Sequence, residues 1–531
     1  MTRPDLSDGS ESDLPDKSLS DLSDYELERI LSELEDFQFV HGSLLKIPRG
    51  FNADIDSPVA VARPVGISVI PTPFPRARFD QAFELQTVFN DLYLRVSEDE
   101  EFLRGILENL RNTDEFAAKL SDIWERVRAD GEVQPLRCGV WRSDYMLQAH
   151  QEALDFSRRG GKSRGDLDVF QHTQLKQVEF NTFSCAGGSH ATIVSTAHRY
   201  LASKGGHGIP NVIRERLPEN DALKAIVSLL EAAHLAYGPP VSDMKPTAIL
   251  MTVQGRNVNI CDERPIEYAL SQLESPILLY RVAFSGEVLK HCKLGPNREL
   301  VFQPPSGGPA LEISVVYHRA GYDENEYDRH GVETRYLLER SRAIKCPTIS
   351  SHIAGFKKVQ QELTRLGALE RFLPPKQCSL LRETFMPMYP LDNSTQGLQA
   401  REMALDESRV GDYIFKPNLE GGSNNIYDDD IPEFLAKVDM QQAWDNYVLM
   451  RKIEPPSVHG VLISPISGHQ GPTISELGVL GMCLWRRGGL GQDPKVLANS
   501  GSGWTFKTKA HDVKEMSVVK GYGCFDCPCL V

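Results

Sequence analysis

The stretch DYIFKPNLEGGSNNIY, residues 412–427, combines a predicted strand with a glycine-rich loop. The strand delivers Lys416, and three small residues then follow: Gly421, Gly422 and Ser423. Because glycine has no Cβ, the backbone N–H groups of such a loop can approach phosphate oxygens closely. Lys416 can neutralise phosphate charge, while Glu420 and Asn425 can reach a metal ion. The alternative is an ordinary hairpin turn with polar flanks, and the spacing matches neither the Rossmann fingerprint nor the P-loop.

A second polar segment is VEFN, residues 178–181. Side chains alternate between the two faces of a strand, so Val178 and Phe180 are expected to face a core. Glu179 and Asn181 then share the opposite face, about 6.5–7 Å apart. Mg²⁺ prefers oxygen ligands together with phosphate oxygens, so this segment is a candidate metal-binding strand. The alternative is an exposed polar strand face.

The rest of the chain alternates predicted strands and helices. Strands are predicted at 175–181, 247–253, 313–318, 412–417 and 446–450, and helices at 221–238, 334–345 and 357–373. The first helix is expected to start at Ser23, because Ser23 and Glu26 match the S-x-x-E capping box. Further amphipathic helices are expected across 80–130. This alternation indicates an α/β architecture.

Composition limits the class of protein. With 531 residues, two or three packed units are expected. Asp plus Glu number 73 against 58 Lys plus Arg, a net charge of −15, which argues against a nucleic-acid partner and against an anionic membrane surface. No apolar run approaches the roughly 18–20 residues of a membrane span. The ten cysteines are scattered and no signal peptide is evident, so a cytoplasmic protein with reduced thiols is predicted.

Four further segments are candidates for binding or mobility. The arginines of RSDYM (142–146) and HRAGY (318–322) can bind carboxylates through two bonds, although surface arginines are the common alternative. The lysines of residues 507–523 suit a mobile flap over anionic groups, or a solvated charged face. In the tail, 524–531, three cysteines lack an evident fourth zinc ligand, so a frayed tail with free thiols is expected.

These segments resemble, in order, those of the eukaryotic glutathione synthetases, over roughly residues 40–523. The matching stretches are RSDYMLQ, LKQVEFNTFS, VVYHRAGY, LLERSRAIKCP, AGFKKVQQEL, FKPNLEGGSNNIY, VLMRKIEPP and ISELGVLG. The resemblance implies an ATP-grasp fold with an inserted α/β substrate-binding domain and a glycine-rich lid. The implied parts are a disordered acidic tail (1–22), an N-terminal ATP-grasp part with the metal-binding strand (23–245), the substrate-binding domain (246–350), the lid with the C-terminal nucleotide-binding part (351–523), and the Cys-rich tail (524–531).

The resemblance also implies an activity. ATP phosphorylates the cysteinyl carboxylate of γ-glutamylcysteine, and the amine of glycine then attacks the acyl phosphate. Mg²⁺ is the implied cofactor, ATP the co-substrate, and a small acid and a small amine the other substrates, commonly in a homodimer. Mg²⁺ and cationic side chains neutralise the charge that builds up in phosphoryl transfer.

Residue roles follow from the same resemblance. The implied magnesium ligands are Glu179, Asn181 and Glu420. The implied ATP contacts are Met146, Glu179, Lys357, Lys416, Glu420, Gly421, Gly422, Asn425, Tyr427, Met450, Arg451, Lys452, Ile453, Glu476, Lys509 and Glu515. The implied substrate contacts are Arg142, Ser184, Asn257, Asn259, Glu263, Arg319, Tyr322, Lys507, Val518 and Val519. Arg142, which steadies the acyl phosphate, and Lys507 are the implied catalytic residues.

Several positions depart from the family pattern. They are Ala186, Asn257, Glu263, Ser423, Arg451, Lys507 and the loop 516–521. Most of these lie where the acid and the amine are expected, whereas the metal and phosphate positions are nearly intact. Three hypotheses remain open: a divergent glutathione synthetase, a paralogous ligase for a different acid or amine, and a nucleotide-binding regulator without catalysis.

Overall fold

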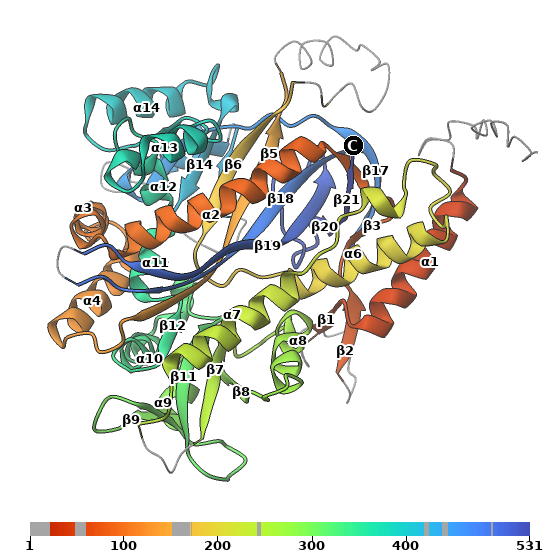
Figure 1. Ribbon diagram of the computed structural model, residues 1–531. Helices are drawn as coiled ribbons and strands as arrows, with labels where there is room; N and C mark the ends of the chain where they lie inside the picture. Colours follow the sequence, from red (N-terminus) through yellow and green to blue (C-terminus); the bar gives the residue numbers. More distant parts are fainter. Residues whose placement is uncertain are drawn as a thin grey trace, which may run out of the picture.

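The computed structural model describes residues 22–47, 60–150, 170, 172–241, 246–418, 424–428, 430–437, 444–489 and 492–531. Helices pack against several separate sheets (Figure 1), which confirms the predicted α/β class. No helix in these ranges is long and apolar enough to cross a membrane. The predicted tail 1–22 lies outside the described residues except for Leu22, which is buried.

The largest sheet has seven strands in the order β17-β3-β20-β19-β18-β5-β6. Their bounds are β3 Ile67–Ser68, β5 Leu136–Gln148, β6 Gln174–Asn181, β17 Val458–Ile463, β18 Gly468–Arg486, β19 Lys495–Ala510 and β20 Cys524–Phe525. Along β18, Val479 packs into the core under α2 (Arg76–Glu98), whereas Leu480 packs into the core under α7 (Ala222–Tyr237). Both faces of the sheet are therefore covered.

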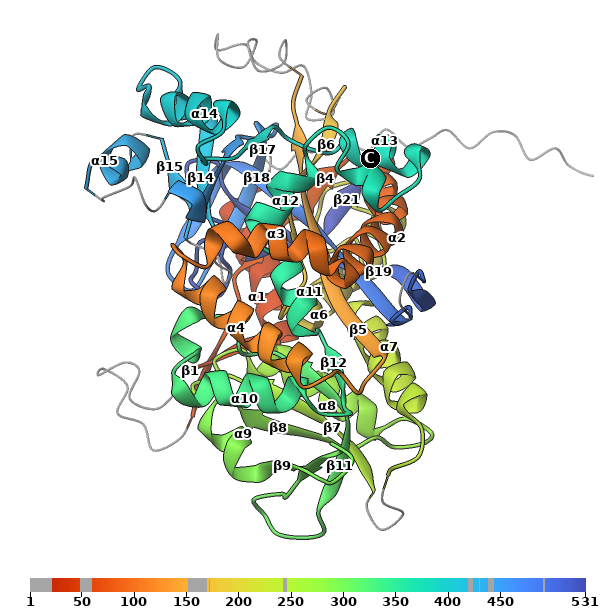
Figure 2. The ribbon, with the colours of Figure 1, turned by 90° about the vertical axis from the view of Figure 1, so that its left-hand side faces the viewer.

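A second sheet has the order β8-β7-β11-β10-β9, with β12 beside β11. Its strands are β7 Thr247–Val253, β8 Leu279–Ala283, β9 Cys292–Leu294, β10 Leu300–Phe302, β11 Leu311–His318 and β12 Ile344–Cys346. Strand β7 is parallel to both neighbours, β11 is antiparallel to β10, and every residue of β11 is buried, as expected for a central strand covered on both faces. Figure 2 shows this sheet at the opposite end of the molecule from β14 and β15.

The third sheet, β13-β16-β14-β15, is antiparallel. Its strands are β13 Met388–Tyr389, β14 Tyr413–Pro417, β15 Ile426–Tyr427 and β16 Tyr447–Arg451. Phe415 stacks on Tyr447 with ring centroids 4.4 Å apart, in the core that this sheet shares with α14 (Thr395–Leu405) and α15 (Asp430–Lys437). The strands predicted at 412–417 and 446–450 are thus confirmed.

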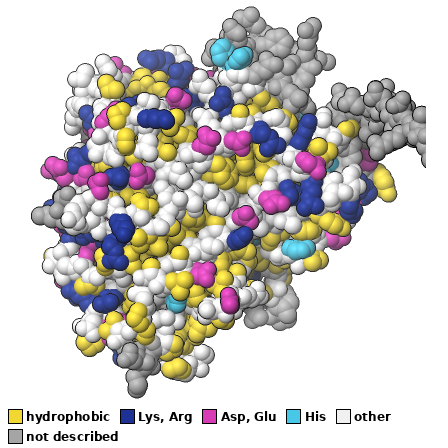
Figure 3. Space-filling view, viewed as in Figure 1, with side chains coloured by type: hydrophobic (Ala, Val, Ile, Leu, Met, Phe, Trp, Pro, Cys, Tyr) yellow, Lys and Arg dark blue, Asp and Glu magenta, His cyan; other side chains and the backbone are white. Residues whose placement is uncertain are grey.

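The remaining elements complete the layers around the sheets. Two small pairs are β1 (Leu44–Ile47) with β2 (Val61–Pro64), and β4 (Thr72–Phe74) with β21 (Pro528–Leu530). The other helices are α1 Asp24–His41, α3 Glu100–Leu110, α4 Glu115–Ala129, α6 Gly188–Ser203, α8 Ile260–Ser271, α9 Gly286–His291, α10 Arg329–Glu339, α11 Ile349–Ala354, α12 Lys357–Leu363 and α13 Pro375–Arg382. Charged side chains of both signs are interspersed on the face seen in Figure 3.

The predicted start of α1 is confirmed. The Ser23 side chain accepts the N–H of Glu26, and the Glu26 carboxylate accepts the N–H of Ser23 at 2.9 Å. Gly42 ends the helix in the left-handed conformation, with φ +79°. Ile30 and Leu34 are buried, so the apolar periodicity of this segment marks its core face.

Two predicted helices are too long. The helix predicted at 334–345 ends at Glu339, because residues 344–346 pair with β11 as strand β12 instead. The helix predicted at 357–373 ends at Leu363. Gly367 adopts φ +87°, a left-handed conformation that interrupts a helix.

The prediction of a frayed C-terminal tail is wrong. Strand β20 pairs with β19 and β3, and β21 pairs with β4. All three tail cysteines are buried: Cys524, Cys527 and Cys529. Phe525 and Leu530 belong to the main hydrophobic core, and this burial is what orders the segment.

Candidate functional site

A cavity of about 1080 Å³ lies between the large sheet and the four-stranded sheet. Strands β5, β6, β18 and β19 line one side, and β14 and β15 line the other. Residues 511–520, which follow β19, and residues 254–259, which follow β7, complete its wall. The volume is at the upper end of that of ordinary ligand pockets, so more than one small molecule fits.

A β-bulge shapes the strand that carries Glu179 and Asn181. The register between β5 and β6 shifts between Asp144 and Tyr145, which leaves Val178 as an extra residue. Val178 lines the cavity, so the prediction that it faces a core is wrong. Glu179 and Asn181 do share one face and both line the cavity.

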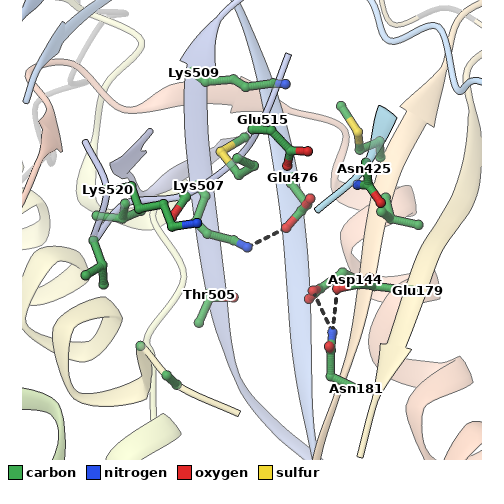
Figure 4. Close-up of a pocket in the computed structure, with 18 of the residues that line it drawn as sticks. Asp144, Glu179, Asn181, Asn425, Glu476, Thr505, Lys507, Lys509, Glu515 and Lys520 are labelled. Atoms are coloured by element: carbon green, nitrogen blue, oxygen red, sulfur yellow. Dashed lines mark hydrogen bonds and ion pairs between the residues drawn. The ribbon is translucent and has the colours of Figure 1, made fainter. Parts of the chain in front are cut away.

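A chain of hydrogen bonds joins this strand to β5 (Figure 4). The Asn181 Nδ2 donates to Glu179 Oε1 and to Asp144 Oδ2, both at 3.0 Å. Arg142 binds Asp144 through two bonds, of 2.6 and 2.8 Å, and donates to the carbonyl of Ala186 at 3.1 Å. The sequence analysis identified Arg142 and missed Asp144. The two residues are two positions apart in one strand, which signals that their side chains share a face.

Gly478 on β18 makes room for this pair. A Cβ at Gly478 would lie 2.5 Å from Asp144 Oδ1, 2.5 Å from Thr505 Oγ1 and 2.8 Å from Arg142 Cδ. Any larger residue would therefore displace the arginine–carboxylate pair. The first glycine in the stretch ISELGVLG is explained by this close approach.

Two lysines lie beside Glu179. Lys357 Nζ is 3.1 Å from Glu179 Oε2, and the buried Lys416 donates to the carbonyl of Val178 at 3.1 Å. Burial alone would raise the pKa of Glu179, but Lys357 and Lys416 hold it well below its usual range. Burial lowers the pKa of Lys416, and Glu179 opposes this effect. A carboxylate flanked by two cations suits a bound metal together with an anion.

Strands β18 and β19 bring a further ion pair to the cavity. Glu476 and Lys507 lie opposite each other in register, with Lys507 Nζ 2.5 Å from Glu476 Oε1. Burial raises the pKa of Glu476, and Lys507 opposes this. Burial also lowers the pKa of Lys509 to about 8. Lys507 and Lys509 are strand residues, so the prediction of a mobile flap is wrong for them.

The end of the cavity near the second sheet holds Arg319. Its guanidinium lies 2.8 Å from Asp262, which also accepts the backbone N–H groups of Gly187 and Ser189 at 2.9 and 3.0 Å. The Ser184 hydroxyl donates to the carbonyl of Arg319 at 3.1 Å. Arg319 Nε is buried without a hydrogen-bond partner among the described residues.

Glu263, a position that departs from the family pattern, is occupied by protein partners. Its Oε2 accepts from Asn257 Nδ2 at 2.6 Å and from Arg281 at 2.6 Å. Asn259 lies 3.2 Å from His190 Nε2, and Gln254 donates to the Tyr322 hydroxyl at 2.9 Å. Asp262 and Arg281 were not identified from the sequence, because they meet the site only through the folding of β7, β8 and α8.

Most of the predicted site residues line this one cavity. They are Arg142, Met146, Glu179, Asn181, Ser184, Asn257, Asn259, Glu263, Arg319, Tyr322, Lys357, Lys416, Asn425, Tyr427, Lys452, Ile453, Glu476, Lys507, Lys509, Glu515, Val518 and Val519. Met450 is buried in a small core, and Arg451 is exposed, so the structure does not bring these two to the cavity lining. Glu420, Gly421 and Gly422 lie outside the described residues.

A cavity between two sheets, with lysines and a carboxylate–amide pair at one end and a buried arginine at the other, suits an ATP-dependent ligase with the ATP-grasp fold. The chain belongs to the eukaryotic glutathione synthase family, whose ATP-binding domain model matches residues 24–530. It is 31% identical to the glutathione synthetase large chain of Schizosaccharomyces pombe, over 94% of this chain and 96% of that one. It is 32% identical to the glutathione synthetase of Mus musculus, over 95% and 97%.

A solved structure shares the fold. The apo form of a glutathione synthetase-like effector from Globodera pallida superposes with a TM-score of 0.68 and 21% identity. The likeness covers 96% of this chain and 97% of that chain. The architecture described above is therefore one that a solved relative also adopts.

Proposed function

We propose that this chain is a glutathione synthase that joins γ-glutamylcysteine to glycine through an acyl phosphate formed from ATP. The observation that carries the proposal is a continuous set of contacts across one cavity. Glu179 and Asn181 lead to Asp144 and Arg142, and Arg142 reaches the carbonyl of Ala186. The next residue, Gly187, donates to Asp262, which binds Arg319. Arg142 thereby links the end of the cavity around Glu179 and Asn181, which we call the nucleotide end, with the end around Arg319, which we call the acid end.

The nucleotide end suits phosphates and Mg²⁺. Lys357 and Lys416 bind phosphate oxygens in this proposal, in a buried setting that strengthens charge interactions. The oxygens of Glu179, Asn181 and Asp144 are the hard ligands that Mg²⁺ prefers. In this proposal phosphate oxygens and Glu420 complete its coordination. Bound Mg²⁺ would neutralise phosphate charge.

Arg142 is the residue that we assign to the reacting carboxylate. A carboxylate is a poor electrophile, and phosphorylation supplies a good leaving group. The guanidinium of Arg142 is fixed by Asp144, so it is already oriented toward charge that develops on the acyl phosphate. At the acid end, Arg319 with Asp262 orients the far carboxylate of the substrate.

The remaining assignments belong to the same proposal. The second sheet, within 246–350, acts as the substrate-binding domain, and the parts 23–245 and 351–523 form the ATP-grasp unit. The protein acts as a cytoplasmic homodimer. Met450 and Arg451 contribute backbone groups rather than side chains to the adenine pocket.

The test is phosphate release by the purified chain with ATP and Mg²⁺, measured against acids and amines in pairs. We expect release that requires both γ-glutamylcysteine and glycine, with glutathione as the product. Turnover with a different acid–amine pair, and none with these two, would instead establish the paralogous ligase. Tight ATP binding without turnover in any pair would establish the regulator.

A further inference from the structure

One histidine of the cavity wall has no role in the reaction proposed above. His190 lies in the first turn of α6, which packs against α1 and α8 (Figure 1). It lines the cavity, is only 2% exposed, and lies close to Asp262 and Arg319 of the acid end. Its Nδ1 is 3.2 Å from Ser43 Oγ, and its Nε2 is 3.2 Å from Asn259 Oδ1. The ring therefore bridges a buried serine and a predicted substrate contact.

The ring of His190 is neutral at pH 7. Burial lowers its pKa, and the nearby Asp262 only partly opposes this effect. A neutral imidazole carries its proton on one nitrogen and accepts a hydrogen bond at the other. Of the two contacts of His190, one is therefore donated by the ring and the other is accepted by it.

Ser43, which precedes β1, decides which nitrogen carries the proton. Its side chain is fully buried, and within the described part of the chain its hydroxyl has no hydrogen-bond partner other than His190. A buried hydroxyl proton without an acceptor is costly, so the hydroxyl donates to Nδ1 and the ring proton lies on Nε2. Nε2 then donates to Oδ1 of Asn259. The Nδ2 of Asn259 is not buried and forms no hydrogen bond with a described residue.

We propose that His190 is a positioning residue that turns the amide of Asn259 so that its N–H groups donate to an oxygen of the acid substrate; this rests on the proposed function. The Ser43 hydroxyl fixes the direction of the chain of hydrogen bonds. Asn259 then presents donors and no acceptor to the acid end. This end of the cavity consequently selects a carboxylate or carbonyl oxygen at that point and disfavours an ammonium group there.

The backbone of Asn259 is held without the help of His190. Its N–H donates to Asn257 Oδ1 at 2.9 Å, and Asn257 in turn donates to Glu263 at 2.6 Å. The ring of His190 also packs on Phe525, with ring centroids 5.5 Å apart, a contact that an apolar side chain can replace. Loss of the imidazole should therefore free the side-chain amide of Asn259 and leave the surrounding fold intact.

The test measures the KM of each substrate in His190→Leu, which keeps an apolar side chain against Phe525. The KM for γ-glutamylcysteine should rise about 5–10-fold, the loss of roughly one hydrogen bond, while kcat and the KM values for ATP and glycine stay within about twofold. His190→Gln, whose amide can donate to the same oxygen of Asn259, should recover most of the loss. In an Asn259→Ala background, His190→Leu should raise the KM for γ-glutamylcysteine by less than about twofold.

The outcomes separate the proposal from its alternatives. An unchanged KM for γ-glutamylcysteine in His190→Leu would overturn it, and so would equal rises for all three substrates, which indicate a packing role. The same rise in the Asn259→Ala background would show that His190 acts without Asn259 and would overturn it too. If the unaltered chain makes no glutathione, the proposed function fails and this proposal fails with it. His234→Leu is the matched control, because it removes a bond of 2.7 Å to the Ser314 hydroxyl outside the cavity lining.

Discussion

Asp526, in the segment expected to be frayed, is a fully buried carboxylate. It accepts the hydroxyls of Thr72 and Thr508 at 2.6 Å each, and the N–H of Cys527 at 2.6 Å. Burial raises its pKa to about 6, although these hydrogen bonds act in the opposite direction. We predict that Asp526→Asn flattens the dependence of stability on pH between about pH 4 and pH 7.

The size of the effect follows from the two pKa values. In the unfolded chain the carboxyl ionises near 3.8, and in the folded chain near 6. Between these values the folded state binds more protons, so its stability falls as the pH rises through this window. A difference of roughly two pKa units corresponds to ~3 kcal/mol. Asp526→Asn has no carboxyl at this position, so it does not lose stability in this window. Its unfolding free energy at pH 4 should nevertheless be about 1–2 kcal/mol lower than that of the unaltered chain, because the threonine hydroxyls must turn to accept from the new amide.

The assay is urea unfolding followed by tryptophan fluorescence, since Trp504 on β19 is buried close to this segment. The difference in unfolding free energy between the variant and the unaltered chain should shift by ~3 kcal/mol in favour of the variant from pH 4 to pH 7. Asp36→Asn, on an exposed position of α1, should show no such shift. Parallel pH profiles for Asp526→Asn and the unaltered chain would refute the reasoning.

Two further predictions concern the cations of the cavity. Lys416→Met should lower kcat by about 10²–10³-fold because it removes charge at the phosphates. Its far-ultraviolet circular dichroism spectrum should stay unchanged, and the control Lys376→Met should keep the kcat of the unaltered chain. A kcat of Lys416→Met within about threefold of the unaltered chain would contradict this. Since burial lowers the pKa of Lys509 to about 8, kcat/KM for ATP should fall as the pH rises above about 8, and Lys509→Arg should abolish that fall. A fall that persists in Lys509→Arg would show that a different group titrates.

Much of the architecture could be predicted because its signals are local. The capping box at Ser23, the strand that carries Glu179 and the strand that carries Lys416 each depend on a few neighbouring residues. The grouping of the site residues came from a resemblance, and the structure brings most of them to one cavity. Their roles remain predictions.

What could not be predicted depends on pairing between distant segments. The bulge at Val178 exists because β5 and β6 shift register, and no pattern within VEFN encodes that shift. Asp262 reaches the site because it caps the backbone of residues 187–189 and pairs with Arg319, contacts that span more than fifty positions in the sequence. The single-sequence pattern around Asp262 gives no signal of either contact.

The C-terminal segment shows how such pairing bears on the site. Cys524 and Phe525 lie opposite Thr508 and Lys507 in the register of β20 and β19. Asp526 then binds the hydroxyl of Thr508, which lies between the two lysines that face the cavity. The last residues of the chain therefore fix the strand from which Lys507 holds Glu476. Without this segment the strand would be paired only with β18, so the position of Lys507 beside Glu476 depends on the segment.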